Sequence, residues 1–132
     1  RTYPACPGVK DDWGRFLIFA GTYFFYMAGW EFLWRGFTLF GLKEKLGYYA
    51  IFVQTIPFVI LHFGKPSAES FSSIFAGLAL GVLSWRSRSF WYAMLTHTAV
   101  IIAINTVAVL RFRAGNYGVG FADIGEVLGV LF

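Results

Sequence analysis

The sequence predicts an all-α fold, a polytopic bundle of transmembrane helices with about four spans. Of its 132 residues, 58% are hydrophobic and 14% are charged, whereas soluble domains carry about 25% charged residues. So few charges could hardly cover a surface that faces water. Aromatic residues make up 21% of the chain, which is typical of lipid-facing surfaces with interfacial aromatic belts. We therefore expect an integral, multi-pass membrane protein in contact with lipid, as in a bacterial cytoplasmic membrane.

Four apolar runs follow the polar lead-in RTYPACPGVKDDW, residues 1–13. They cover about residues 15–40, 48–63, 70–85 and 90–110. A helix needs roughly 20 apolar residues to cross a bilayer, so the first and last runs are long enough. The two middle runs are shorter, and we expect them to borrow flanking residues or to be tilted within the bundle. No run alternates polar and apolar residues as a barrel strand would.

The connections between the runs are short: GLKEKLG (41–47), GKPSAE (64–69) and RSRS (86–89). Short loops make consecutive helices antiparallel neighbours. Gly41 and Gly47 are predicted to bracket the first loop as helix stops, and Pro66 is predicted to break the chain after the second run. The pattern GLALG (77–81) permits close approach of two helices.

We divide the chain into an N-terminal surface segment (1–13), the transmembrane bundle (14–113) and a C-terminal segment (114–132) that is interfacial or part of a further span. Because the chain begins at Arg1 and not at methionine, we expect a processed or partial chain. The net charge is +4, but the Lys and Arg residues form no stripe, so no nucleic-acid partner is expected. The single cysteine, Cys6, excludes an internal disulfide and a cysteine-based metal site.

Few ionisable side chains interrupt the apolar runs. Together with the neutral Asn105, they are the candidate functional residues: Glu31, Arg35, His62, His97 and Asn105, with Glu69 just beyond the second run. An ionisable group within a span is costly, so it is normally internal, paired and functional. Depth is counted from the face that carries the first and third connections. At about 1.5 Å per residue, Glu31, His62 and His97 lie at depths of about 15, 22 and 12 Å. Three helices therefore present a carboxylate and two imidazoles at overlapping depths.

Each of these side chains also has a structural interpretation, and the sequence leaves both open. Glu31 and Arg35 have the i,i+4 spacing of an ion pair on one helix face. The pair either holds its helix to the neighbouring helices or keeps Glu31 ionised in a dry site. His62 is either an interfacial residue or a member of the site. His97 is either a satisfied core histidine or a member of the site.

The two remaining candidates are equally open. Asn105 either forms an interhelical hydrogen bond or lines the same cavity. Glu69 either stabilises the first turn of the third helix, with Ser67 or Ser70 as its N-cap, or contributes to catalysis.

One or two carboxylates and two histidines in a membrane cavity fit the hydrolysis of an amide. A carboxylate can act as general base toward water, and neutral imidazoles can orient that water or stabilise an oxyanion. The alternative is a divalent metal such as zinc, held by His62 and His97 together with a carboxylate. The sequence contains no G-x-S-x-G or H-E-x-x-H motif.

Three segments carry a family resemblance: WEFLWRGF with Glu31 and Arg35, PFVILH with Phe58 and His62, and MLTHTAV with His97. In this order and spacing, they resemble the intramembrane CAAX-protease and bacteriocin-processing family, also called CPBP or Abi. HFGKPSAE (62–69) and RSRSFWYAMLTH (86–97) are similar to a bacterial branch that begins with W-E-F-x-x-R-G-F. The resemblance covers roughly residues 29–105.

The resemblance implies a bundle of about eight helices, and intramembrane peptide-bond hydrolysis by a glutamate-activated water held with histidines. It also implies trimming of prenylated C-termini, or a part in bacteriocin maturation and immunity. In the family pattern E-E-x-x-x-R, the first glutamate is regarded as the base that activates water. This chain has Trp30 at that position, and Glu31 is the glutamate that remains. In place of the family's H-x-x-x-N, this chain has Ile101 four residues after His97, and Asn105 is the nearest amide.

We therefore expect an intramembrane endopeptidase that cleaves a membrane-associated peptide or protein, with Glu31 as the base and Arg35 fixing its charge. The two histidines would orient the water or bind the metal, as in a metalloprotease, and Glu69 and Asn105 would have secondary roles. The alternative is a catalytically inactive relative that serves as scaffold or accessory subunit, with other membrane subunits as partners. A small transporter comes last, because the chain has no internal repeat.

Overall fold

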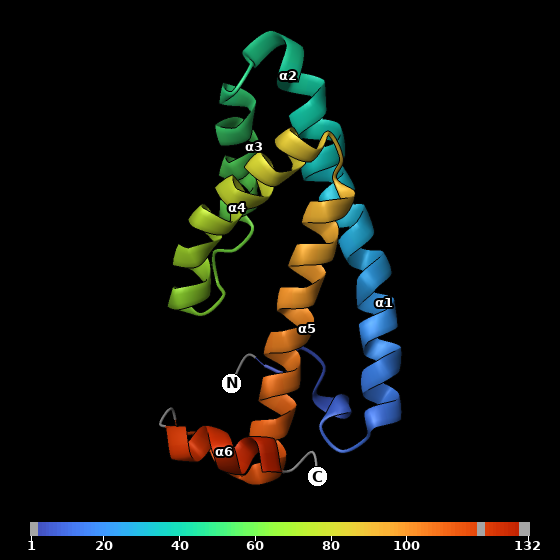
Figure 1. The fold of residues 1–132 in the computed structure, drawn as a ribbon, viewed down its shortest axis with the longest axis vertical. Coiled ribbons are helices and arrows are strands. Elements are labelled where there is room, and N and C mark those ends of the chain that lie inside the picture. The colour runs from blue at the N-terminus through green and yellow to red at the C-terminus, as the bar shows by residue number, and fades with distance from the viewer. Residues whose placement is uncertain (1–2, 119–120, 130–132) are drawn as a thin grey trace. The chain divides into compact units, whose positions relative to one another are not determined.

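The fold is known from a computed structural model, which describes residues 3–118 and 121–129. The predicted end segments 1–13 and 114–132 therefore fall in part, at 1–2, 119–120 and 130–132, outside the described residues. The regular structure of the described residues is helical throughout (Figure 1): η1 (Pro7–Val9), α1 (Trp13–Glu31), η2 (Phe32–Leu39), α2 (Phe40–Leu46), α3 (Tyr49–Ile60), α4 (Ser67–Ser87), α5 (Trp91–Ala114) and α6 (Phe121–Gly129). This confirms the predicted all-α fold.

Three helical stretches among the described residues are long and apolar enough to cross a membrane: Trp13–Leu46, Ser67–Ser87 and Trp91–Ala114. The first is one continuous path, because α1 leads through η2 into α2 without a break. The second predicted run forms the shorter apolar helix α3, which ends at Ile60. With its hydrophobic surface, the chain is an integral membrane protein.

The prediction that Gly41 ends the first helix is wrong. The helix continues through the predicted loop to Leu46, and only Gly47, with φ of 53°, ends it. A glycine inside a helix costs about 1 kcal/mol relative to alanine, which a long helix tolerates. Lys43 and Lys45 lie in the last turn, where cations interact favourably with the helix dipole.

The chain divides into two compact units, residues 1–23 with 99–132 and residues 24–98. In the first unit, Val9 of η1, Phe16 of α1 and Val109 of α5 form a buried cluster. Helix α6 lies across the end of α5 (Figure 1).

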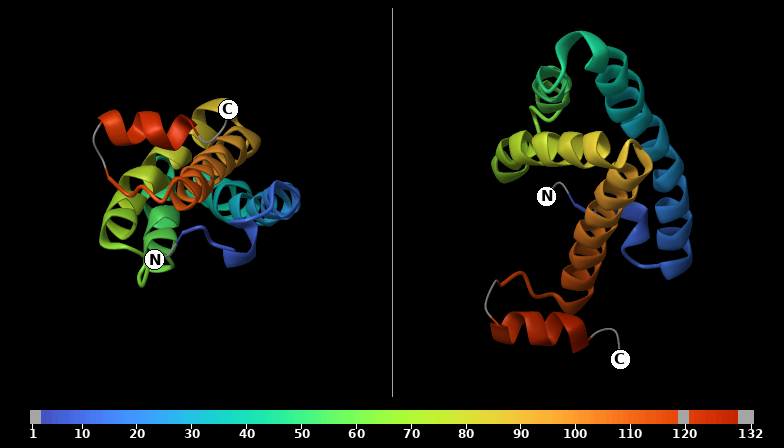
Figure 2. Two further views of the ribbon diagram at one scale, coloured as in Figure 1. Left: turned by 90° about the horizontal axis from the view of Figure 1, so that it is seen from below. Right: turned by 45° about the horizontal axis from the view of Figure 1, so that its top comes forward.

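In the second unit, α3 and α4 pack side by side (Figure 2). Their close approach depends on two glycines of α4. A Cβ added at Gly77 would lie 2.8 Å from Thr55 Cγ2, and one added at Gly81 would lie 2.7 Å from Gln54 Nε2. The close packing predicted from GLALG is thereby confirmed.

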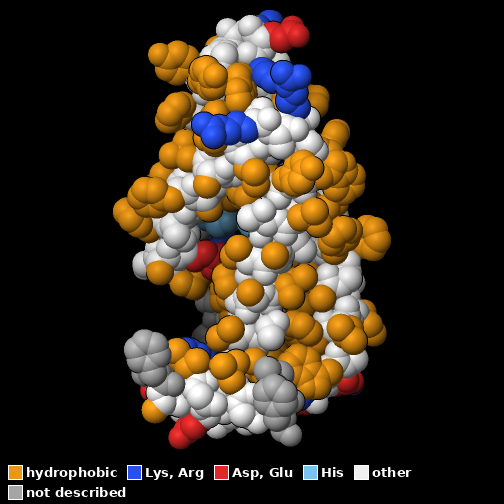
Figure 3. Space-filling view, in the orientation of Figure 1, with side chains coloured by type: hydrophobic (Ala, Val, Ile, Leu, Met, Phe, Trp, Pro, Cys, Tyr) orange, Lys and Arg blue, Asp and Glu red, His pale blue; other side chains and the backbone are white. Residues whose placement is uncertain are grey.

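The surface is rich in exposed apolar and aromatic side chains. Phe25, Tyr49 and Ile18 each expose more than 70% of their area, and Figure 3 shows hydrophobic side chains over most of one face. Such a surface suits contact with lipid rather than with water. Lys and Arg side chains gather near α2 in the same view.

The segment η2 is a wide, π-type helix that follows Glu31 directly. In a regular α-helix, every fourth residue moves on by about 40° around the axis, whereas the wider turns of a π-helix move it back. Glu31, Arg35 and Leu39 are all buried, so this segment turns residues spaced by four to the inside of the protein. Short π-type segments are frequent at functional sites.

Candidate functional site

The carboxylate of Glu31 holds two basic side chains within residues 24–98. Its Oε1 accepts hydrogen bonds from Arg35 Nη1 at 3.0 Å and from His97 Nδ1 at 2.6 Å. The side chains of Glu31 and Arg35 are fully buried, and that of His97 is 12% exposed. Buried charges are stable only when they are paired and hydrogen-bonded, and this arrangement supplies both conditions.

Phe58 of α3 lies beside this group with its ring almost fully buried. The guanidinium carbon of Arg35 is 4.3 Å from the centre of the ring, a distance at which a cation is attracted to an aromatic face. The ring centres of His62 and His97 lie 4.5 and 5.8 Å from that of Phe58. One phenyl ring thus contacts the counter-ion of Glu31 and both histidines.

His62 lies in the turn after α3, outside the three candidate spans. Its Nδ1 is 2.7 Å from the carbonyl oxygen of Phe58. A carbonyl oxygen only accepts, so Nδ1 carries the proton and Nε2 keeps a free lone pair. Burial lowers the pKa of His62 below its ordinary value. The carbonyl of Phe58 and the carboxylate of Glu69 oppose this pKa shift, whereas Lys65 and His97 reinforce it.

The same reasoning fixes the proton of His97. Glu31, as a carboxylate paired with Arg35, only accepts hydrogen bonds, so Nδ1 of His97 is the donor. In the neutral form of the ring, the lone pair of His97 therefore also lies on Nε2. Both histidines present an acceptor nitrogen that can bind a water proton or a metal.

Several polar atoms of this region are buried without a hydrogen-bond partner among the described residues. They are Glu31 Oε2, Arg35 Nε and Nη2, and the indole Nε1 atoms of Trp30 and Trp34. Buried polar groups are normally satisfied, so a cluster of exceptions needs an explanation. Four of these five atoms are donors, which suits an oxyanion or a peptide carbonyl oxygen.

Glu69 belongs to the first turn of α4, where its Oε1 forms an ion pair with Lys65 Nζ at 2.7 Å. The predicted N-cap is wrong: Pro66 occupies that position, and no side chain caps the helix. Ser70 instead donates its hydroxyl to the carbonyl oxygen of His62 at 2.7 Å. Glu69 therefore acts on His62 through its charge, and its own catalytic role stays a prediction.

Asn105 lies in the unit formed by residues 1–23 and 99–132. Its Oδ1 accepts a hydrogen bond from the backbone N–H of Ala5, and its Nδ2 donates to the carbonyl oxygen of Ile101, both at 2.8 Å. The first bond fastens the N-terminal segment to α5, and the second lies within α5. They favour the structural interpretation of Asn105.

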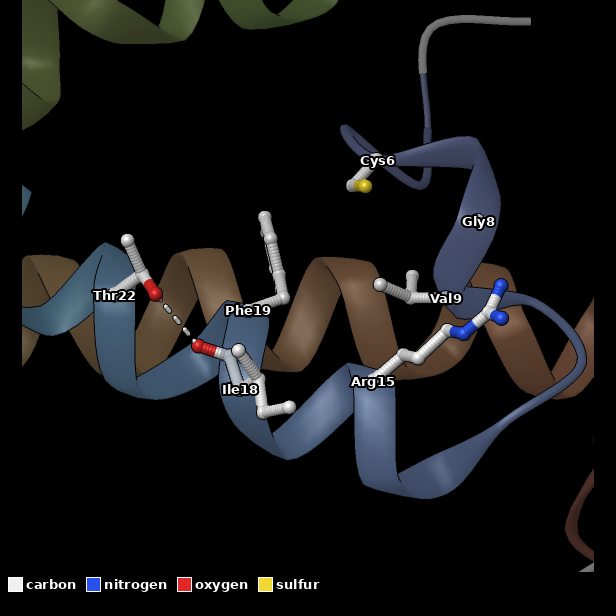
Figure 4. Close-up of a pocket in the computed structure, with 7 residues that line it drawn as sticks. All are labelled: Cys6, Gly8, Val9, Arg15, Ile18, Phe19 and Thr22. Carbon is white, nitrogen blue, oxygen red and sulfur yellow. Dashed lines mark hydrogen bonds between the residues drawn. The ribbon is translucent and has the colours of Figure 1, made fainter.

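The described residues contain no group of three or more His, Cys, Asp or Glu side chains arranged to hold a metal ion. The predicted metal site thus has two histidine nitrogens and no third ligand from that set. A separate pocket of about 330 Å³ lies between the N-terminal segment and α1 (Figure 4). On its wall Thr22 donates to the carbonyl oxygen of Ile18, and Arg15 lies 3.7 Å from Asp12. None of the predicted site residues lines this pocket, so it is not the candidate site.

Phe58 is part of the segment PFVILH that carries the family resemblance, but the sequence alone did not predict its ring as a member of the site. Phe58 precedes His62 by four residues, and such spacing places two side chains on the same helix face. That signal was present. Its contacts with Arg35 and His97 depend on tertiary packing, which no spacing reveals.

A family model described as type II CAAX prenyl endopeptidase Rce1-like matches residues 12–103. These residues are more than half of the chain, and they include Glu31, Arg35 and both histidines. No curated protein and no solved structure matches the chain. The predicted resemblance to CAAX proteases is confirmed at the level of the family, whereas the bacterial branch stays a prediction. The chain therefore belongs to the Rce1-like family of type II CAAX prenyl endopeptidases.

Proposed function

We propose that the protein is an intramembrane endopeptidase that hydrolyses a peptide bond of a membrane-associated substrate at Glu31, His62 and His97. The observation that carries this proposal is the 2.6 Å hydrogen bond between His97 Nδ1 and Glu31 Oε1. It joins two spans through ionisable groups in a lipid environment, where such groups are normally functional. Membership of a protease family supports the same class of reaction.

The geometry favours a division of roles in which Glu31 acts through His97. A carboxylate bound to Nδ1 of a histidine orients the ring and stabilises the imidazolium formed when Nε2 takes a proton. Oε1 of Glu31 is already bound twice, and its Oε2 is buried. Nε2 of His97 is therefore the better-placed base, and Glu31 is its positioning residue.

In the proposed reaction, Nε2 of His97 takes a proton from a water molecule while the water oxygen bonds to the peptide carbonyl carbon. The carbonyl π electrons move to the oxygen, where buried N–H groups of Arg35 and Trp30 are candidate donors. When the oxyanion collapses, the C–N bond breaks and the proton on Nε2 passes to the leaving nitrogen. Nε2 of His62 accepts a hydrogen bond from the second hydrogen of the water and orients it. The same two Nε2 atoms would be the histidine ligands of the predicted metal.

The test uses the full chain in lipid nanodiscs, with peptides that end in a prenylated CAAX sequence and their unprenylated counterparts. Glu31→Gln, His62→Ala and His97→Ala should each lower turnover by about 10³-fold or more, as in other sites where an imidazole is oriented by a carboxylate. Glu44→Gln changes an exposed acid of the same unit and should leave turnover unchanged.

Wild-type turnover that persists in Glu31→Gln and His62→Ala would refute the proposal. Absence of cleavage together with stable co-purification of other membrane subunits would favour the scaffold alternative.

A further inference from the structure

We infer that Phe58 is a positioning residue of this site and that Gly77 of α4 holds it in place from behind. The effect that this inference predicts on turnover rests on the proposed function. The effect that it predicts on the orientation and tautomer of the two imidazoles does not, because both can be measured without a substrate.

The ring of Phe58 touches each basic group of the cluster. The guanidinium of Arg35 lies over its face at 4.3 Å, the ring centre of His62 lies 4.5 Å away with the rings tilted by 42°, and His97 meets it at an interplanar angle of 64°. Edge-to-face and cation–π contacts of this kind fix orientation as well as distance. Removing the ring would free all three side chains to turn.

The backbone of Phe58 adds a second constraint, because its carbonyl oxygen accepts the Nδ1 proton of His62. That bond sets the tautomer of His62 and leaves the lone pair on Nε2. A displacement of Phe58 therefore moves the ring that packs against His62. It also moves the carbonyl oxygen that holds the proton on Nδ1 of His62.

Gly77 determines how deeply Phe58 can sit. A Cβ added there would lie 3.1 Å from Phe58 Cδ1 and 2.8 Å from Thr55 Cγ2, so any larger residue must push these side chains away from α4. Gly81 lies one turn further on and is equally tight, but its neighbours are Gln54 and Ile51. The two glycines offer a matched pair, of which only one backs the site.

The experiment compares Phe58→Leu and Gly77→Ala with two controls, Phe52→Leu and Gly81→Ala. Phe52 is on the same helix as Phe58, but 56% of its area is exposed. Each variant is measured for the ¹⁵N chemical shifts of the imidazole nitrogens, for kcat and KM separately, and for thermal unfolding. Phe58→Tyr keeps the ring and serves as the conservative rescue.

We expect Phe58→Leu to lower kcat by about 10²-fold, the loss that a misplacement of about 1 Å can cause, with KM unchanged. Gly77→Ala should lower kcat in the same direction, and both should shift the ¹⁵N signals of His62 and His97. Phe58→Tyr should restore kcat, and the two controls should leave kcat and the ¹⁵N signals as in the wild type, even where Gly81→Ala lowers the unfolding temperature.

Wild-type ¹⁵N signals in folded Phe58→Leu would overturn the inference. Equal effects of Gly77→Ala and Gly81→Ala on those signals would overturn the part assigned to Gly77. If Phe58→Leu does not fold, Gly77→Ala still tests the inference, because it keeps the side chain of Phe58. A wild-type protein that cleaves no substrate contradicts the proposed function alone, because the ¹⁵N comparison then still decides on Phe58.

Discussion

Gln54 and Phe58 lie one turn apart on α3, and each packs against a glycine of α4. Both are buried, but Gln54 is a hydrogen-bonding amide whereas Phe58 is an apolar ring. Nε2 of Gln54 donates to the carbonyl oxygen of Gly77 on α4 at 3.0 Å and to that of Ile51 on its own helix at 2.9 Å, so the first of these bonds joins the two helices. The side chain of Phe58 has no polar group. The two imidazoles in contact with its ring, His62 and His97, each present Nε2 as an acceptor when neutral. Within the interface between α3 and α4, Gln54 therefore serves helix association, whereas Phe58, one turn away, contacts the candidate catalytic groups.

The largest effect is expected on the Phe58 side, in Arg35→Met. This change leaves the carboxylate of Glu31 buried without its cation, and breaking a buried ion pair in this way costs about 3–5 kcal/mol. Urea or thermal unfolding in detergent measures it, with the exposed Arg86→Met as control. An unfolding free energy equal to that of the wild type would show that Arg35 is not the counter-ion.

A smaller effect is expected on the Gln54 side, in Gln54→Leu. The interhelical hydrogen bond to the carbonyl of Gly77 is lost, and such bonds are worth about 0.6 kcal/mol on average within membranes. The unfolding free energy should fall by about that amount, while turnover per folded molecule stays unchanged. A large loss of turnover would break the comparison, because the two roles would then not be separable.

The smallest effect concerns the pKa of His62, which burial lowers below its ordinary value of about 6.5. Lys65→Met removes a neighbouring cation and should raise this pKa, whereas Glu69→Gln removes an anion and should lower it further. Imidazole NMR titration measures both shifts. Shifts of the same sign in the two variants would contradict the assignment of these charges.

The lowered pKa also has a consequence for stability. The folded state binds the His62 proton less tightly than the unfolded chain does, so this group costs stability as the pH falls below about 6.5. The neutral ring that the proposed mechanism needs persists at neutral pH.

Much of this arrangement follows from residue types along the chain. Glu31, Arg35 and His97 stand out because so few ionisable groups interrupt the apolar runs, and counting depth correctly put Glu31 and His97 close together. Helix ends were less predictable: Gly41 has the composition of a stop, but the helix continues because its neighbours are good helix formers and a single glycine is only a small penalty.

Tertiary contacts lay beyond the sequence. Asn105 has the same polarity whether it lines a cavity or binds the N–H of Ala5, and only packing decides between these. The wide turns of η2 depend on the balance of hydrogen bonds along the helix, for which the letters FLWRGFTL carry no clear signal. The role of Phe58 required both features, the local spacing to His62 and a fold that brings His97 to the same ring.

The two bonds to Oε1 of Glu31 differ in how early they can form. Arg35 is four residues away on the same helical path, so the first hydrophobic segment can enter the bilayer during biosynthesis with its negative charge already neutralised. His97 is 66 residues away, and its bond forms only after two further helices have been made. The ion pair with Arg35 can therefore accompany Glu31 into the bilayer, and the hydrogen bond from His97 is added only when the later helices have folded against the first.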